Sequence, residues 1–106
     1  MRLRDRTGDV APSLDELRAQ RDAVLAIARR HGASRLRVFG SVARGESTPT
    51  SDVDLVVDMA TGRTLFDLGG LAADLEELFG RPVDVVSSSG LAPRLEKRLD
   101  DEAVLL

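Results

Sequence analysis

The chain has 106 residues, enough for one domain with one core and one site. Its net charge of −3 and its three Phe, with no Trp or Tyr, argue against duplex binding and against aromatic stacking on single-stranded nucleic acid. Without cysteine, disulfides and thiolate metal sites are excluded. There is no signal peptide and no apolar run of about 20 residues, so we expect a cytoplasmic protein with neither a membrane nor a nucleic-acid partner.

The first part of the chain combines a charged leader with a capped helix. Residues 1–11 carry five charged side chains and few apolar ones, which predicts a flexible leader before a single domain over 12–106. Ser13 and Glu16 form a capping box that begins a helix. Gly32 is predicted to end this helix, because glycine is common directly after a helix C-terminus. Apolar residues recur between them at helical spacing: Leu14, Leu17, Val24, Leu25 and Ala28. We therefore predict one continuous helix.

Two short strands flank a turn-rich loop. The strand over 35–39 runs directly into Gly40 and Ser41, where a short helical turn is expected before the loop over 47–51. The second strand, over 52–58, alternates with a period of two. Asp52, Asp54, Val56 and Asp58 then share one face, and Val53, Leu55 and Val57 share the other.

A second helix is predicted over 64–79, with Gly80 as its stop. Its buried stripe is formed by Leu68, Leu71, Leu75 and Leu78. Gly69 and Gly70 interrupt this pattern, and each weakens the helix by roughly 1 kcal/mol relative to Ala. We attribute them to a close approach of helix and sheet, or to a helix that begins at Gly70.

The rest of the chain completes a small sheet. A third strand over 83–87 places Asp84 and Val86 on one face, a last helix begins at Pro93, and residues 103–106 form a possible edge strand. The order is helix, strand, strand, helix, strand, helix and short strand. It is typical of an α+β (α/β-like) fold, with a small mixed β-sheet and helices mainly on one face.

Asp52 and Asp54 form the sharpest chemical feature. Two carboxylates on one face of a strand lie about 7 Å apart at the backbone, close enough to share one or two divalent ions. Oxygen-only ligands favour Mg²⁺ or Mn²⁺. Two surface aspartates at a strand entry are the ordinary alternative, so the pair alone does not establish a site. Asp58 lies too far along the strand to join it.

Gly40 and Ser41 supply a second part. Glycine permits close backbone approach, and the N–H groups of a following helical turn can bind an anion together with the Ser hydroxyl. Asp84 is flanked by valines, where an isolated carboxylate is costly to bury. It therefore either lies at an exposed edge or faces Asp52 and Asp54 across a metal. The combination favours phosphoryl or nucleotidyl transfer, although each part alone is common.

The combined pattern resembles the signature of the minimal nucleotidyltransferases of the polymerase-β superfamily, and within it the MNT-type antitoxins encoded beside HEPN-domain toxins. The resemblance covers most of the chain. It is carried by Gly40-Ser41-Val42-Ala43-Arg44-Gly45-Glu46 and by Ser51-Asp52-Val53-Asp54-Leu55-Val56-Val57.

The resemblance implies a role for each matched residue. Gly40 and Ser41 would bind the nucleotide phosphates. The metal ligands would be Asp52 and Asp54, with Asp84 as the third carboxylate. Arg44 stands where the family carries a basic residue, and a phosphate contact and a solvated loop arginine are equally open for it.

The implied reaction moves AMP from ATP to a hydroxyl of the partner toxin, typically that of a tyrosine. Two Mg²⁺ ions are expected as cofactors. Because this chain has no Tyr, a tyrosine acceptor has to lie on another molecule. Two alternatives stay open: a non-catalytic module that inhibits its partner by contact, and nucleotidyl transfer to a small-molecule hydroxyl. The oligomeric state also stays open.

Overall fold

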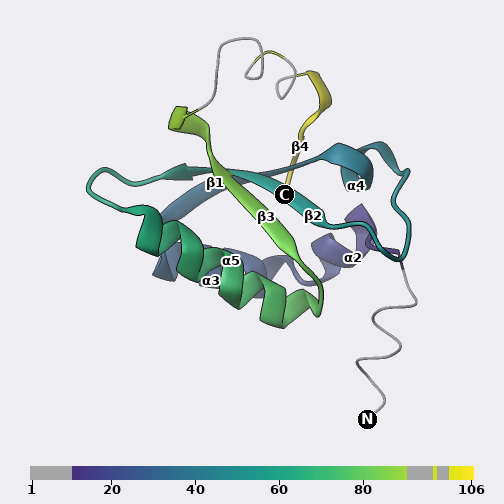
Figure 1. Cartoon of the computed structure of the whole chain (residues 1–106), viewed down its shortest axis with the longest axis horizontal. Helices are drawn as coiled ribbons and strands as arrows, with labels where there is room; N and C mark the ends of the chain where they lie inside the picture. Colours follow the sequence, from purple (N-terminus) through teal and green to yellow (C-terminus); the bar gives the residue numbers. More distant parts are fainter. Residues whose placement is uncertain (1–10, 91–96, 98–100) are drawn as a thin grey trace.

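Four strands form one mixed sheet in the order β3-β2-β1-β4 (Figure 1). β1 (Ala33–Phe39) is antiparallel to both β2 (Val53–Met59) and β4 (Val104–Leu105). β3 (Val83–Ser87) is parallel to β2, and α5 (Leu65–Phe79) makes the long crossover that parallel neighbours require. The three predicted strands and the apolar tail strand are thus confirmed, and β3 has the predicted bounds.

The computed structural model describes residues 11–90, 97 and 101–106. Nearly all of the predicted leader, and of the helix predicted from Pro93, lies outside these residues. Within the described part, β3 is followed by a single 3-10 turn, η1 (Ser88–Gly90). None of the described helices is long and apolar enough to cross a membrane.

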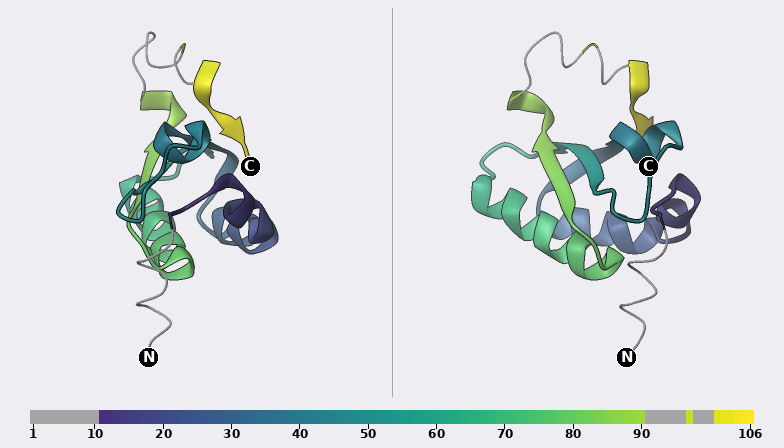
Figure 2. Two further views of the ribbon diagram at one scale, coloured as in Figure 1. Left: turned by 90° about the vertical axis from the view of Figure 1, so that its right-hand side faces the viewer. Right: turned by 45° about the vertical axis from the view of Figure 1, so that its right-hand side comes forward.

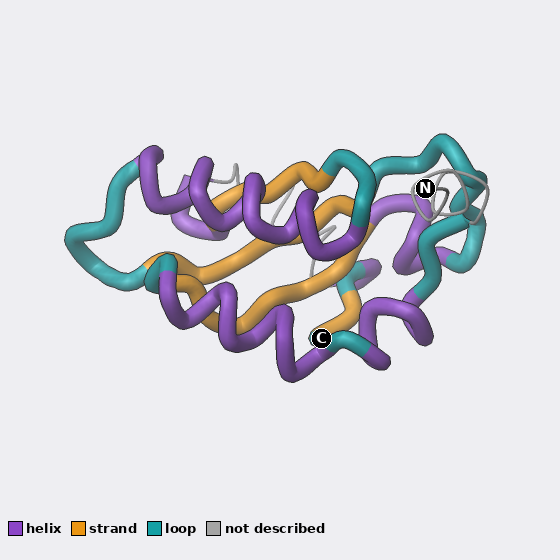
Figure 3. The backbone as a smooth tube through the Cα atoms, turned by 90° about the horizontal axis from the view of Figure 1, so that it is seen from below, coloured by secondary structure: helices purple, strands orange, loops and turns teal. Residues whose placement is uncertain are grey.

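The longer helices cover one face of the sheet. α3 (Arg21–Arg30) packs against β1, and α5 packs against β3 and α3. Figure 3 looks onto this helical layer, and Figure 2 shows the short α4 (Gly40–Arg44) on the other side of the strands. The core between the helices and the sheet includes Leu17, Val24, Ala28, Leu36, Val38, Leu55, Val57, Leu71 and Leu75. This arrangement confirms the predicted α+β fold.

The predicted first helix is two helices. α2 (Leu14–Ala19) begins at the Ser13 cap, whose hydroxyl accepts the N–H of Glu16, and it ends at Gln20 before α3 starts. The prediction of one continuous helix was wrong because Gln20 leaves the helical conformation, with φ −105° and ψ 16°. There the side chain of Arg21 donates to the carbonyl of Leu106 at 2.9 Å, so this position serves a chain-end contact.

The β2 pattern was right for one face and incomplete for the other. Val53, Leu55 and Val57 are fully buried against the helices, as predicted. Val56, predicted to share the face of the aspartates, is fully buried as well. It lies on a central strand, paired with Arg37 on one side and with Val86 on the other, so its neighbours cover it.

The two glycines of α5 have different environments. The helix runs through both, so the alternative start at Gly70 was wrong. A Cβ on Gly70 would lie 2.9 Å from the ring of His31, which is hydrogen-bonded to Asp74 at 2.7 Å. The close approach of α5 at Gly70 is therefore to His31 at the end of α3, and the expected contact with the sheet was wrong. A Cβ on Gly69 would meet nothing within 4 Å.

We predict opposite effects of alanine at these neighbouring positions. Gly69→Ala should raise the free energy of unfolding by about 1 kcal/mol, because Ala is the better helix former and the space is open. Gly70→Ala gains the same propensity but overpacks against His31, at a cost of about 1–3 kcal/mol. Urea denaturation of both variants measures the difference. Equal stabilisation by the two would contradict the His31 contact.

Candidate active site

The parallel pairing of β2 and β3 places Asp54 directly beside Asp84. Neighbouring strands lie about 4.8 Å apart, so the two side chains leave the sheet close together. Asp52 immediately precedes β2, two residues from Asp54 and therefore at the same end of the sheet. The structure thus places all three aspartates at one end of the sheet, with Asp54 and Asp84 on paired strands. Their roles remain predictions.

The end of β1 closes this group from the other side. Phe39 pairs with Asp54, so Gly40 and the turn α4 begin beside that aspartate. Gly40 has φ +74°, and a Cβ there would lie 2.5 Å from Asp54 Oδ2. Only glycine allows both this backbone conformation and this approach. The chain then turns through Ser41 and leaves α4 at Gly45, also left-handed at φ +72°.

The three carboxylates repel one another. Burial raises the pKa of the Asp54 carboxyl above its usual range, and the charges of Asp84 and Asp52 raise it further. Arg44 opposes these effects. A divalent cation among the three side chains would relieve the repulsion that the folded chain otherwise sustains.

The donor set suits Mg²⁺ because it consists of carboxylate oxygens. Within the described residues, no three acidic, histidine or cysteine side chains converge closely enough to form a ready-made metal site. Asp52 and Asp84 are exposed and Asp54 is half-buried. Exposed side chains change rotamer within nanoseconds, so the outer two can turn toward an ion held at Asp54.

Arg44 lies at the end of α4 and forms an ion pair with Glu46. Its Nε donates to Glu46 Oε1 at 2.9 Å, which raises the pKa of the guanidinium. It is half exposed, and its charge also acts on Asp54. Arg44 is thus an ion-paired arginine within electrostatic reach of the carboxylates, and a phosphate contact remains a prediction for it.

Asp58 belongs to a separate cluster further along β2. It forms ion pairs with Arg35 and Arg37, each at 3.5 Å, and accepts a hydrogen bond from Ser88 at 2.6 Å. Its exclusion from the carboxylate group is confirmed. This cluster ties η1 to the two central strands, and it depends on cross-strand pairing that residue spacing alone does not show.

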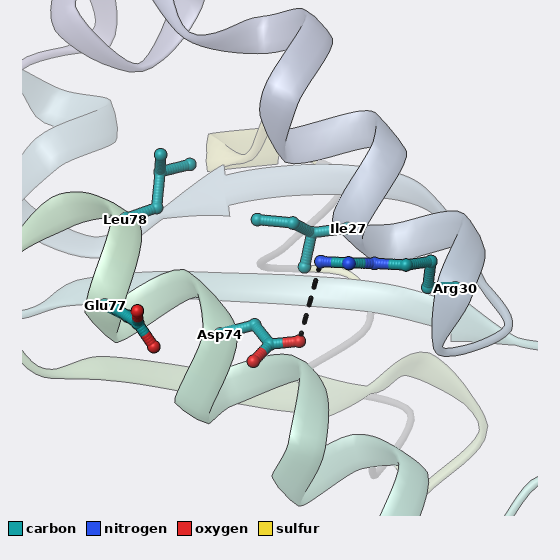
Figure 4. A pocket seen from close by; sticks show the side chains of 5 residues that line it. All are labelled: Ile27, Arg30, Asp74, Glu77 and Leu78. Carbon is teal, nitrogen blue, oxygen red and sulfur yellow. Dashed lines mark ion pairs between the residues drawn. The ribbon is translucent and has the colours of Figure 1, made fainter.

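A hollow of about 370 Å³ lies between α3 and α5, on the helical side of the molecule (Figure 4). It is lined by Ile27, Arg30, Asp74, Glu77 and Leu78, with an ion pair of 3.8 Å between Arg30 and Asp74. None of the predicted site residues lines it. The hollow is therefore separate from the carboxylate group.

The chain is similar to proteins of a known family. The family described as "Nucleotidyltransferase domain" matches residues 21–106. MJ0435 of Methanocaldococcus jannaschii, named as a protein adenylyltransferase, is 41% identical over 81 residues, which is 76% of this chain and 87% of that protein. The protein adenylyltransferase MntA of Thermococcus cleftensis is 39% identical over 75 residues, 71% of this chain and 76% of its own.

Solved structures agree in fold. A structure described as a minimal nucleotidyltransferase is 54% identical, with a TM-score of 0.80 over 90% of this chain and 97% of that one. A chain from a complex of a tri-AMPylated Shewanella oneidensis HEPN toxin with its MNT antitoxin is 17% identical, with a TM-score of 0.64 over 83% of this chain and 69% of that one. The latter likeness concerns the fold alone.

Two left-handed glycines allow a controlled test of the contact with Asp54. Gly45→Ala should cost about 1–2 kcal/mol of stability from backbone conformation alone, because a Cβ there meets nothing within 4 Å. Gly40→Ala should cost at least about 1 kcal/mol more, since its Cβ displaces the Asp54 carboxylate. Chemical denaturation measures both. Equal losses would show that Asp54 does not press on Gly40.

We also predict how the charges couple. In metal-free buffer, Asp84→Asn should lower the pKa of Asp54 measured by NMR, whereas Asp22→Asn, at an exposed position of α3, should leave it unchanged. Because folding raises this pKa, the folded chain holds the proton more tightly than the unfolded chain does. The contribution of Asp54 to stability is therefore largest below its unfolded pKa and is lost as the pH rises through the folded one. An unchanged pKa in Asp84→Asn would refute the coupling.

Proposed function

Because the chain belongs to the nucleotidyltransferase domain family and is by homology a protein adenylyltransferase, we propose that it is an antitoxin that transfers AMP from ATP to a hydroxyl of a cognate HEPN toxin. The observation that carries this proposal is the pairing of Asp54 with Asp84, with Asp52 two residues before Asp54, beside the turn that begins at Gly40. Modification of the hydroxyl would silence the toxin.

Asp52 and Asp54 are the proposed Mg²⁺ ligands, with Asp84 as the third carboxylate and Mn²⁺ as a possible substitute. When bound, the cations neutralise phosphate charge and the charge that develops on the leaving pyrophosphate. The environment of Asp54 supports this assignment: the carboxyl is half-buried, and the nearby charges of Asp84 and Asp52 add to the effect of burial in raising its pKa.

The remaining steps fall to residues of the chain. Backbone N–H groups at the start of α4 and the hydroxyl of Ser41 orient the triphosphate, and Gly40 lets it approach. Asp84 lies on the edge strand β3 with an exposed side chain, so an acceptor hydroxyl can reach it. As the acceptor oxygen bonds to the α-phosphorus and the bond to pyrophosphate breaks, Asp84 takes the hydroxyl proton.

The acceptor is proposed to be a tyrosine of the toxin. The chain itself has no Tyr, so such an acceptor comes from a partner. A distant structural neighbour is the MNT antitoxin bound to a tri-AMPylated HEPN toxin, which supports a toxin partner for this chain. Inhibition by contact alone would not require three mutually repelling carboxylates, and their presence favours catalysis.

The test is transfer to the purified cognate toxin with Mg²⁺ and ATP, followed by intact-mass spectrometry. We expect AMP adducts with the natural chain and with the exposed control Asp22→Asn. Asp52→Asn and Asp54→Asn should each slow transfer by about a thousandfold or more, since metal stabilisation is worth several kcal/mol.

Other outcomes separate the alternatives. An unmodified toxin that is nevertheless inhibited in a stable complex would favour the contact-only module. Consumption of ATP only when a small-molecule alcohol is added would favour a small-molecule acceptor. Tyr→Phe variants of the toxin identify the acceptor, because the adduct is lost with its hydroxyl.

A further inference from the structure

Arg81 lies in the turn that carries the chain from α5 into β3. The helix ends at Gly80 in a left-handed conformation, φ 70°, and Pro82 precedes the first strand residue. The N–H of Val83 is accepted by the Glu76 carboxylate at 3.1 Å. Arg81 is thus half-buried in a turn whose two ends are both held by hydrogen bonds.

The guanidinium of Arg81 reaches across to the loop between α4 and β2. Its Nη1 donates to the carbonyls of Pro49 at 3.3 Å and Ser51 at 3.5 Å. That loop is folded on itself, because the N–H of Ser51 donates to the Thr48 carbonyl at 2.9 Å and the N–H of Thr48 to Ser51 Oγ at 2.8 Å. One arginine therefore fastens a preformed turn as a unit.

The backbone on both sides of Asp52 is consequently held by two consecutive residues, Arg81 and Pro82. The carbonyl directly before it, of Ser51, accepts the hydrogen bond from Arg81. The N–H directly after it, of Val53, donates to the carbonyl of Pro82 at 3.1 Å. The turn that leads into β3 thus sets the position of the first aspartate relative to the strand that carries the third carboxylate.

We propose that Arg81 is a positioning residue for the active site, which fixes the 48–51 turn so that Asp52 stays aligned with Asp54 and Asp84. This inference rests on the proposed function of these carboxylates. The backbone that carries a catalytic group has to be held within about 0.5 Å of its productive position, even where the side chain can rotate. Asp52 lies outside the β2 ladder, so loop contacts have to restrain its backbone. Arg81 supplies a side-chain restraint from outside the loop.

The experiment measures Mn²⁺ binding by electron paramagnetic resonance, in the presence of a non-hydrolysable ATP analogue. Arg81→Met keeps the aliphatic stem and removes the donors, and it should weaken Mn²⁺ binding about tenfold or more, as loss of outer hydrogen-bond partners does at metal sites. Arg81→Lys keeps one charged donor and should restore most of the binding. Arg63→Met, at a surface ion pair beyond the other end of β2, should bind Mn²⁺ like the natural chain.

Thermal melting without metal separates positioning from stability. A purely structural arginine would lower the melting temperature of Arg81→Met and leave Mn²⁺ affinity of the folded protein unchanged, which would overturn the proposal. So would Arg81→Lys binding as weakly as Arg81→Met. If Arg81→Met does not fold, Arg81→Gln takes its place, because its amide is too short for both carbonyls. Failure of the natural chain itself to bind Mn²⁺ with the analogue would instead refute the proposed function.

Discussion

The pairing of Asp54 with Asp84 across two parallel strands is the constraint around which this small fold is built. Parallel neighbours need a long crossover, and α5 supplies it while covering the helical face of the sheet. The pairing brings like charges together, which adds to the effect of burial in raising the pKa of Asp54, so the apolar core has to offset a repulsion at the strand ends. Gly40 completes the enclosure by letting the end of β1 approach Asp54 Oδ2.

Much of this arrangement could be predicted because it depends on local rules. The bounds of β3 follow from Pro82, the run of valines and the serines that end it. Gly80, at positive φ, ends α5 where the sequence predicts a stop. The adjacency of Asp54 and Asp84 follows once a helix is expected to connect two consecutive strands, since such a connection makes them parallel neighbours.

The features that escaped prediction depend on contacts between distant parts of the chain. The break at Gln20 accompanies a bond from Arg21 to the last residue, 85 positions away. Gly70 leaves room for the ring of His31, which packs against it from the end of another helix. From the sequence, Arg81 is an ordinary turn residue. Its role depends on hydrogen bonds to a loop some 30 positions earlier, which only the structure shows. Periodicity reports which face of an element is buried, but not which residue meets it there.

A crystal structure with Mn²⁺ and a non-hydrolysable ATP analogue tests the central claim most directly, because anomalous scattering locates the metal. Our account predicts Mn²⁺ bound by the carboxylates of Asp52 and Asp54, with Asp84 facing it and the triphosphate at the start of α4. Nucleotide and metal in the hollow between α3 and α5, with the three carboxylates left without an ion, would contradict it.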